Sequence, residues 1–117
     1  MLRNVKSTQR KIRQIEIILK EASGSLSISG PASNQVTSAT SASGVISIEL
    51  KQAFAAEPVI VGNSSIVDGQ VEISGSGNKG GSSDKIEVTH SVAGSATDLD
   101  EGQIHLLIIG SDVSSKV

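Results

Sequence analysis

Hydrophobic residues recur from Met1 to Ala22 at spacings that alternate between three and four. This period of 3.5 residues is typical of a coiled coil, in which positions a and d of each heptad face a partner helix. Polar and basic residues fill most of the positions between them. The spacing therefore predicts a helix over residues 1–23, with a trimerisation seam made of Val5, Thr8, Ile12, Ile15, Leu19 and Ala22.

Two further isoleucines lie off this seam. In the predicted helix Ile18 only widens the apolar stripe, whereas Ile17 points away from the bundle axis. An outward isoleucine among polar neighbours indicates that another surface covers it. We expect the protein's own β-domain or a partner to do so, and one tolerated exposed side chain is the alternative.

Beyond Ser23-Gly24, which is a typical helix stop, the hydrophobic period changes from 3.5 to two. Short stretches of alternating aliphatic and polar residues are separated by clusters of Gly, Ser, Asn and Asp, and the longest runs from Ile86 to Val92. Such a series is typical of a small antiparallel β-sandwich or barrel. The predicted fold class is mainly β, with a coiled-coil stem helix at residues 1–23 and an antiparallel β-domain at residues 24–117.

Two stretches of the predicted β-domain, residues 59–61 and 104–109, are almost continuously apolar. A strand that is apolar on both sides is usually covered on both. We therefore expect each stretch to be central in a sheet or to lie against another subunit.

The composition also favours association between chains. Aromatic residues make up 1% of the 117 residues, and Phe54 is the sole ring, so the core must consist of small aliphatic side chains. Large aromatic burials are missing, and we expect the chain to recover apolar burial between subunits. Isoleucine at both a and d in the middle of the seam favours three or more strands, so we predict a homotrimer.

Charge is unevenly distributed. Residues 1–22 hold six Lys and Arg against two Glu, whereas the remainder holds four Lys against ten acids. A basic stem indicates docking onto an acidic protein surface, and nucleic acid is not an expected partner because no aromatic residue accompanies the cations. No apolar run is long enough for a membrane span. The predicted docking residues are Arg3, Lys6, Arg10, Lys11, Arg13 and Ile17.

Few residues are candidates for catalysis or for binding a ligand or metal ion. The glycine-rich stretch 75–81 lacks the spacing of a phosphate-binding loop, and the acidic turn 98–101 could hold a cation but lacks the length of a calcium loop. A solvated turn is the alternative. His90 and His105 each lie in a predicted strand, where a single histidine is usually a hydrogen-bonded interior or interface residue. We therefore predict no enzyme, no catalytic residue, no cofactor and no metal site.

The stretch from Phe54 to Val61, followed by Ile104 to Gly110, resembles the β-domains of bacteriophage fibre and decoration proteins. In those domains a Phe-x-x-x-Pro strand and a final apolar strand ending in Gly recur, and H-type lectin domains share the pattern. The resemblance covers residues 45–111. Leu106 and Leu107 stand where the lectin-like members often carry an aromatic residue, so no ring is present there to stack on a sugar.

The resemblance implies a virion protein. Our leading hypothesis is a homotrimeric capsid decoration, cement or fibre protein that docks through its N-terminal helix onto a capsid, neck or tail protein of the same particle. The alternative is a glycan-recognising receptor-binding module of a tail fibre. The part of the particle, the host and a cation at the acidic turn stay open.

Overall fold

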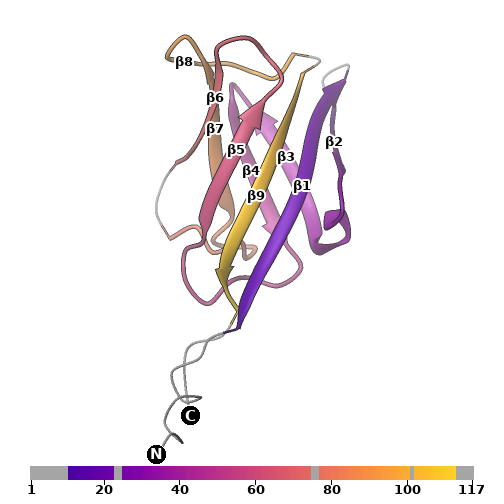
Figure 1. Cartoon of the computed structure of the whole chain (residues 1–117), viewed down its shortest axis with the longest axis vertical. Helices are drawn as coiled ribbons and strands as arrows, with labels where there is room; N and C mark the ends of the chain where they lie inside the picture. The colour runs from indigo at the N-terminus through magenta and orange to yellow at the C-terminus, as the bar shows by residue number, and fades with distance from the viewer. Residues whose placement is uncertain (1–10, 23–24, 75–76, 101, 113–117) are drawn as a thin grey trace, which may run out of the picture.

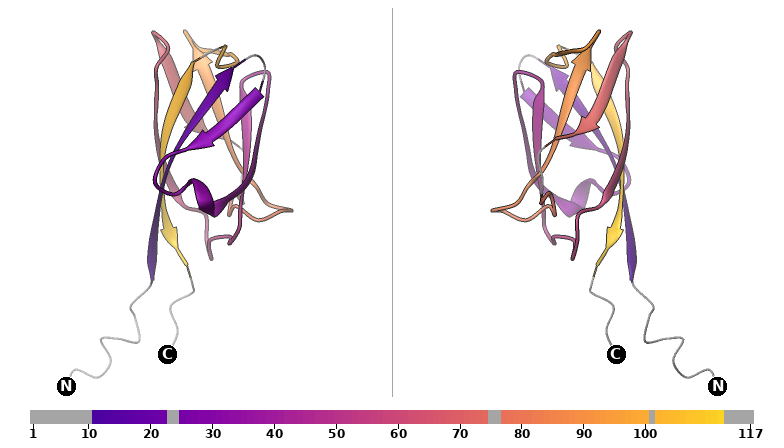
Figure 2. Two further views of the ribbon diagram at one scale, coloured as in Figure 1. Left: turned by 90° about the vertical axis from the view of Figure 1, so that its right-hand side faces the viewer. Right: turned by 90° about the vertical axis from the view of Figure 1, so that its left-hand side faces the viewer.

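The computed structural model describes residues 11–22, 25–74, 77–100 and 102–112. These residues form two antiparallel sheets that lie one on the other as a sandwich, seen face-on in Figure 1 and edge-on in Figure 2. The described part of the chain contains no α-helix, and its one helical element is the short 3-10 turn η2 (Ser33–Gln35). No helix in that part could therefore cross a membrane.

Sheet A has four strands, and sheet B has five. The order in sheet A is β2 (Ser25–Ser29), β1 (Ile12–Ala22), β9 (Gln103–Ser111), β5 (Val59–Ser64). The order in sheet B is β3 (Val36–Ala42), β4 (Val45–Leu50), β7 (Ile86–Val92), β6 (Gly69–Ile73), with the short β8 (Ser95–Ala96) paired to β7.

The centre of sheet A is the long pair of β1 and β9. They are antiparallel over nine residues, from Ile12 opposite Ser111 to Lys20 opposite Gln103. Beyond the pair, the Asp112 N–H donates to the Lys11 carbonyl at 2.8 Å. The described chain thus enters and leaves the sandwich side by side at one end, which is the lower end in Figure 1.

The core lies between the two sheets and is almost wholly aliphatic. Each strand sends alternate side chains inward, and the single ring, Phe54, packs at the end where β9 leaves the sandwich, against Gly110. The buried apolar side chains are Ile15, Ile17, Leu19, Ala32, Val36, Ile46, Ile48, Leu50, Phe54, Ile86, Val88, Leu99, Ile104, Leu106 and Ile108.

The predicted N-terminal helix is wrong over residues 12–22. That segment is strand β1, which pairs with β2 on one side and β9 on the other, so no coiled-coil stem exists there. Residues 12–22 belong to the β-sandwich itself. The part of the predicted stem at residues 1–10 lies outside the described residues.

The physical reason is a second period hidden in the same residues. Ile12, Ile15 and Leu19 fit a spacing of three and four, but Ile15, Ile17 and Leu19 fit a spacing of two. The strand buries all three of the latter, including Ile17, which the helix would have turned outward. β-branched isoleucines also favour strands, where their restricted rotamers pack well.

Candidate functional site

The outward side chains of β5 and β9 form an apolar patch. Val59 and Val61 of β5 are 65% and 54% exposed. In the register of the sheet Val59 lies beside Ile109, and Val61 lies beside Leu107, both of which are partly buried. We call these four residues the β5–β9 patch.

This patch arises because alternation is lost in two strands. Ile104, Leu106 and Ile108 turn into the core, and the apolar run continues on the outward side through Leu107 and Ile109. The prediction of a central strand at 104–109 is confirmed, because β9 lies between β1 and β5. The run 59–61 instead falls in β5, an edge strand of sheet A, so its cover by another subunit stays a prediction.

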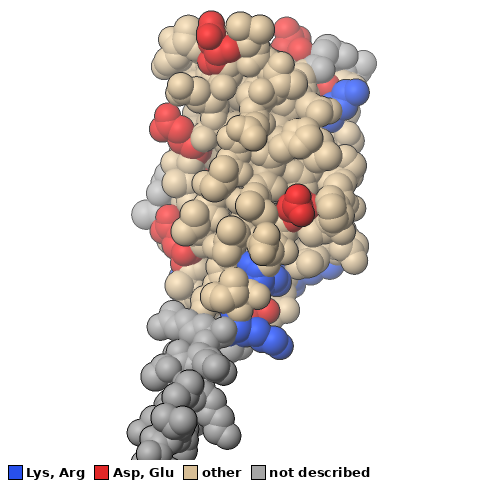
Figure 3. Space-filling model, in the orientation of Figure 1, with Lys and Arg blue, Asp and Glu red and all other residues tan. Residues whose placement is uncertain are grey.

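Charge is scarce on the same face. Among the outward positions of the four strands of sheet A, only Glu16 and Lys20 of β1 are charged. Figure 3, which views the molecule from the side of sheet A, shows a broad uncharged surface with acidic and basic groups mostly at its margins. The charged groups of this face are therefore confined to β1, and the outward positions of β2, β5 and β9 carry none.

A shallow depression of about 270 Å³ lies on this face across β1, β9 and β5. Ile18, Val61 and Leu107 give it aliphatic walls, and Glu16, Asn63 and His105 supply polar groups. Gln103 Nε2 lies 3.0 Å from His105 Nε2. Since an amide nitrogen can only donate, His105 Nε2 accepts and the ring hydrogen sits on Nδ1.

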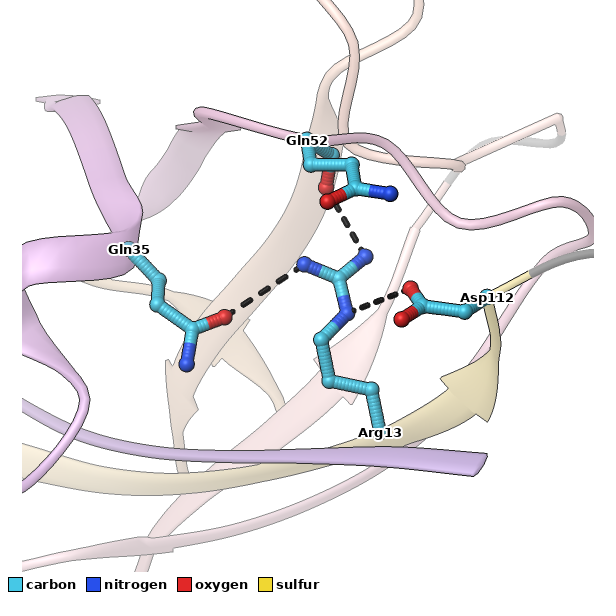
Figure 4. A network of polar contacts seen from close by, with 4 residues as sticks. All are labelled: Arg13, Gln35, Gln52 and Asp112. Atoms are coloured by element: carbon cyan, nitrogen blue, oxygen red, sulfur yellow. Dashed lines mark hydrogen bonds and ion pairs between the residues drawn. The ribbon is translucent and has the colours of Figure 1, made fainter. Parts of the chain in front are cut away.

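Arg13, a predicted docking residue, binds groups of its own chain with its guanidinium (Figure 4). Its Nε lies 2.7 Å from Asp112 Oδ1, and its guanidinium donates to the Gln52 carbonyl at 2.9 Å and to Gln35 Oε1 at 3.4 Å. The guanidinium carbon also stands 4.3 Å from the centroid of the Phe54 ring. Arg13 therefore ties β1 to the residue that follows β9, to the loop after β4 and to the turn η2.

The other predicted docking and seam residues are dispersed. Ile17 is a core residue, only 1% exposed, and Ile15 and Leu19 are fully buried within their own chain. Ile12, Ala22 and Lys11 are exposed. Arg3, Lys6, Arg10, Val5 and Thr8 lie outside the described residues.

His90 is fully buried and holds two chain segments together. A carbonyl only accepts, so Nδ1 donates to the Thr97 carbonyl at 2.7 Å, which leaves Nε2 to accept from the Ser64 hydroxyl at 2.9 Å. The Ser64 oxygen also accepts from the Ile66 N–H, and Gly69 packs directly on it. This serine and histidine resemble a nucleophile and its base in distance, but their polar atoms are engaged in fixing β5, β7 and the segment after β8.

The acidic turn is joined to distant parts of the chain by hydrogen bonds to carboxylates. Asp98 Oδ1 accepts from the Gly44 N–H at 2.8 Å, and the Asp100 N–H donates to Glu21 Oε1 at 2.7 Å. Within the described residues no group of three or more acidic or histidine side chains could hold a metal ion. Glu101 lies outside those residues.

The glycine-rich stretch 75–81 is described only from Gly77 onward. Asn78 is buried there, and its side-chain amide donates to the Ser74 carbonyl at 2.9 Å, while Lys79 is exposed. The buried amide thus anchors the loop to the end of β6.

Comparison with known proteins identified no relative of this chain. No family model matches the chain, and neither a curated protein nor a solved structure is significantly similar to it.

Proposed function

We propose that this protein is a non-enzymatic structural protein of a bacteriophage particle, a capsid decoration, cement or fibre protein that works as a homotrimer. The contact between copies is assigned to the outer face of sheet A. The observation that carries the proposal is the contiguous exposure of Val59 and Val61 beside Leu107 and Ile109.

Apolar exposure of this kind is costly in a lone chain. Fully burying a valine, leucine or isoleucine side chain contributes about 1.5–3 kcal/mol relative to leaving it in water. Single exposed aliphatic residues are ordinary, but a contiguous patch marks an interaction surface. The aliphatic, nearly ring-free core provides a further reason for recovering burial between copies.

The particle setting rests on the resemblance to phage appendage domains. The two stretches that carry it are the ones that build the patch: the first ends in β5, and the second is most of β9. Phe54 and Pro58 of the first stretch are buried, so they position β5. Entry and exit of the chain at one end suit an appendage that is attached at that end.

Docking through an N-terminal helix is wrong over residues 12–22, because these residues form strand β1. The coiled-coil seam was also the reason for expecting three copies, and that reason no longer applies over residues 12–22. Self-association into a homotrimer is proposed instead on the exposed apolar β5–β9 patch.

The matched variants Val61→Lys and Val67→Lys test the contact. Both positions are exposed, but Val61 belongs to the patch, whereas Val67, 82% exposed, lies in the turn between β5 and β6. In size-exclusion chromatography with light scattering, we expect trimers for the unchanged chain and Val67→Lys, and monomers of unchanged circular dichroism for Val61→Lys. A monomeric unchanged chain, or a trimeric Val61→Lys variant, would contradict the proposal.

The particle assignment has its own test. Purified protein is mixed with phage particles that lack it, and bound copies are counted after sedimentation. We expect saturable binding by the unchanged chain. Absence of binding, together with absence of the chain from native particles by mass spectrometry, would refute the setting and leave the self-association test unaffected.

Glycan recognition is the second candidate. It is favoured by one observation, the convergence of Glu16, Asn63 and His105 on the depression, since carboxylate, amide and imidazole groups all bind sugar hydroxyls. The chain has no Trp or Tyr, and its one phenylalanine, Phe54, is buried and cannot stack on a sugar. Binding on a glycan array that His105→Ala abolishes would support this function over self-association.

A further inference from the structure

We infer that the depression on the outer face of sheet A binds a lysine side chain of a partner protein. The ammonium group of that lysine pairs with the Glu16 carboxylate, and its hydrocarbon stem lies on the aliphatic walls of the depression. The inference goes beyond the proposed self-association and does not depend on the number of copies.

The pairing of the strands places the lining residues in two neighbouring rows that cross β1, β9 and β5. The first row is Glu16, Leu107 and Val61, and the second row is Ile18, His105 and Asn63. Rows that share a face are two residues apart, which is about 6.6 Å along the strands. The carboxylate therefore stands at one corner of the group, and the asparagine amide stands at the opposite corner.

Glu16 is an anion without a partner in the described part of its own chain. Its side chain is exposed, and no described residue forms an ion pair or a hydrogen bond with its carboxylate. The other charged side chain on this face, Lys20, lies four residues further along β1, a separation of about 13 Å. Complementary charge gives a contact its specificity, so this carboxylate favours a cation from outside the chain.

The rest of the depression offers hydrocarbon. Ile18, Val61 and Leu107 form its aliphatic walls, and removing such surface from water is favourable. Lysine carries four methylene groups below its ammonium group, against three in arginine, and lays them along apolar surface while the charged end stays in polar surroundings. Among protein side chains, lysine therefore matches both the walls and the carboxylate best.

The size of the depression also suits one side chain. Sites for small molecules usually enclose about 300–1,000 Å³, whereas this depression is shallow and has about 270 Å³. A partner that inserts one long side chain needs no deeper cavity.

The second row can hold the backbone that carries this lysine. His105 has its ring hydrogen on Nδ1, because Nε2 accepts from Gln103. That hydrogen can be donated to a backbone carbonyl, and the Asn63 amide can both donate and accept. Both side chains are exposed, so a partner backbone can reach them.

Lysine binding and self-association compete for part of this face. Val61 and Leu107 belong both to the depression and to the β5–β9 patch. A copy that covers the patch therefore closes the depression, and the lysine binds a face that no copy covers. The two contacts are separate properties of the chain and need separate measurements.

An NMR titration of the whole chain tests the inference. The probes are Nα-acetyl-lysine methylamide and Nα-acetyl-norleucine methylamide, which has the same hydrocarbon stem without the ammonium group. The variant is Glu16→Gln. The matched control is Glu72→Gln, because Glu72 is also an exposed strand residue but lies on β6 of sheet B.

We expect the lysine derivative to shift the amide resonances of Val61, Asn63 and Leu107. It should bind the unchanged chain about twofold to fivefold more tightly than the norleucine derivative, which is the range of an exposed ion pair. Glu16→Gln should remove this preference, and Glu72→Gln should keep it. Salt at about 1 M should also remove it, because exposed charges are then screened.

Equal binding of the two derivatives by the unchanged chain, or absence of shifts in β1, β5 and β9, would overturn the inference. Loss of the preference in both variants would do the same, because the charge of the whole surface would then be responsible. Shifts caused by neutral monosaccharides but not by the lysine derivative would replace it with the glycan alternative. Light scattering on the same samples reports self-association independently, so the failure of one proposal does not decide the other.

Discussion

The two sheets differ sharply in their outer faces, although their inner faces are alike. In sheet B the outward side chains of β4 and β7 are mostly polar or acidic, namely Ser47, Glu49, Glu87, Thr89 and Ser91 beside Val45, and the Ser47 hydroxyl donates to Glu87 at 3.5 Å. The corresponding positions Val59 and Val61 of β5 and Leu107 and Ile109 of β9 in sheet A are aliphatic. Sheet B therefore has the dry and wet sides of an ordinary antiparallel sheet, whereas sheet A is apolar on both sides over this part of β5 and β9.

The inner faces and the outer faces of the two sheets therefore give different information about the protein. Inner faces report the fold, because both sheets must bury aliphatic side chains to form the sandwich. Outer faces report the surroundings of the folded chain. A strictly alternating strand such as β7 needs only water outside, whereas a strand such as β5 that keeps valine outward is suited to a protein neighbour.

The largest expected effect distinguishes the two sides of β1. Ile17→Ala removes a fully packed core side chain, and we expect a loss of about 2–5 kcal/mol in the free energy of unfolding. Ile12→Ala is the matched control, because Ile12 is 62% exposed on the same strand, and it should change stability by less than about 0.5 kcal/mol. Urea unfolding measures both, and equal effects would show that β1 does not have the inner and outer sides described here.

A smaller effect is expected at the end of sheet A. Arg13→Ala removes an ion pair and two hydrogen bonds that join β1 and β9 to the loop after β4, and hydrogen bonds to charged groups contribute about 1.5–3 kcal/mol. We expect a loss of about 2 kcal/mol in urea unfolding. In a double-mutant cycle with Asp112→Ala, a coupling of about 0.5 kcal/mol or more is expected. A coupling near zero would show that the two side chains act independently.

The smallest effect is expected on the outer face of sheet B. Lys85 Nζ lies 3.9 Å from a Glu49 carboxylate oxygen, and both side chains are partly exposed. Such surface pairs contribute about 0–1 kcal/mol, so Lys85→Ala should lower stability by less than about 0.5 kcal/mol and leave the oligomeric state unchanged. Dissociation of the assembly by Lys85→Ala would transfer the contact surface from sheet A to sheet B.

The sequence by itself determined the strands whose hydrophobic pattern fits only one type of secondary structure. The alternation from Ile86 to Val92 can only be a half-buried strand, and it is β7. The continuous apolar run at 104–109 predicted a strand that is central or lies against another subunit, and β9 is central in sheet A. Local pattern suffices in these cases because no competing period accounts for the same residues.

The tertiary structure decided whether residues 12–22 form a helix or a strand. Residues 12–22 satisfy both a heptad and an alternation, and a local pattern cannot choose between them. What decides is pairing with β9, which lies about ninety residues further along the chain and offers Ile104, Leu106 and Ile108 as core partners. Ile17 distinguishes the two patterns, because it lies off the heptad seam but fits the alternation of a strand.

The candidate site depended on the fold even more strongly. Val59, Val61, Leu107 and Ile109 become one surface only when β5 pairs with β9, and Arg13 ceases to be a surface cation only because Asp112 is brought beside it. A single sequence states which residues are apolar or charged, and its periods state which of them share a face of one strand. Which strands lie side by side, and which face stays open to another molecule, follows from long-range packing that local periods do not encode.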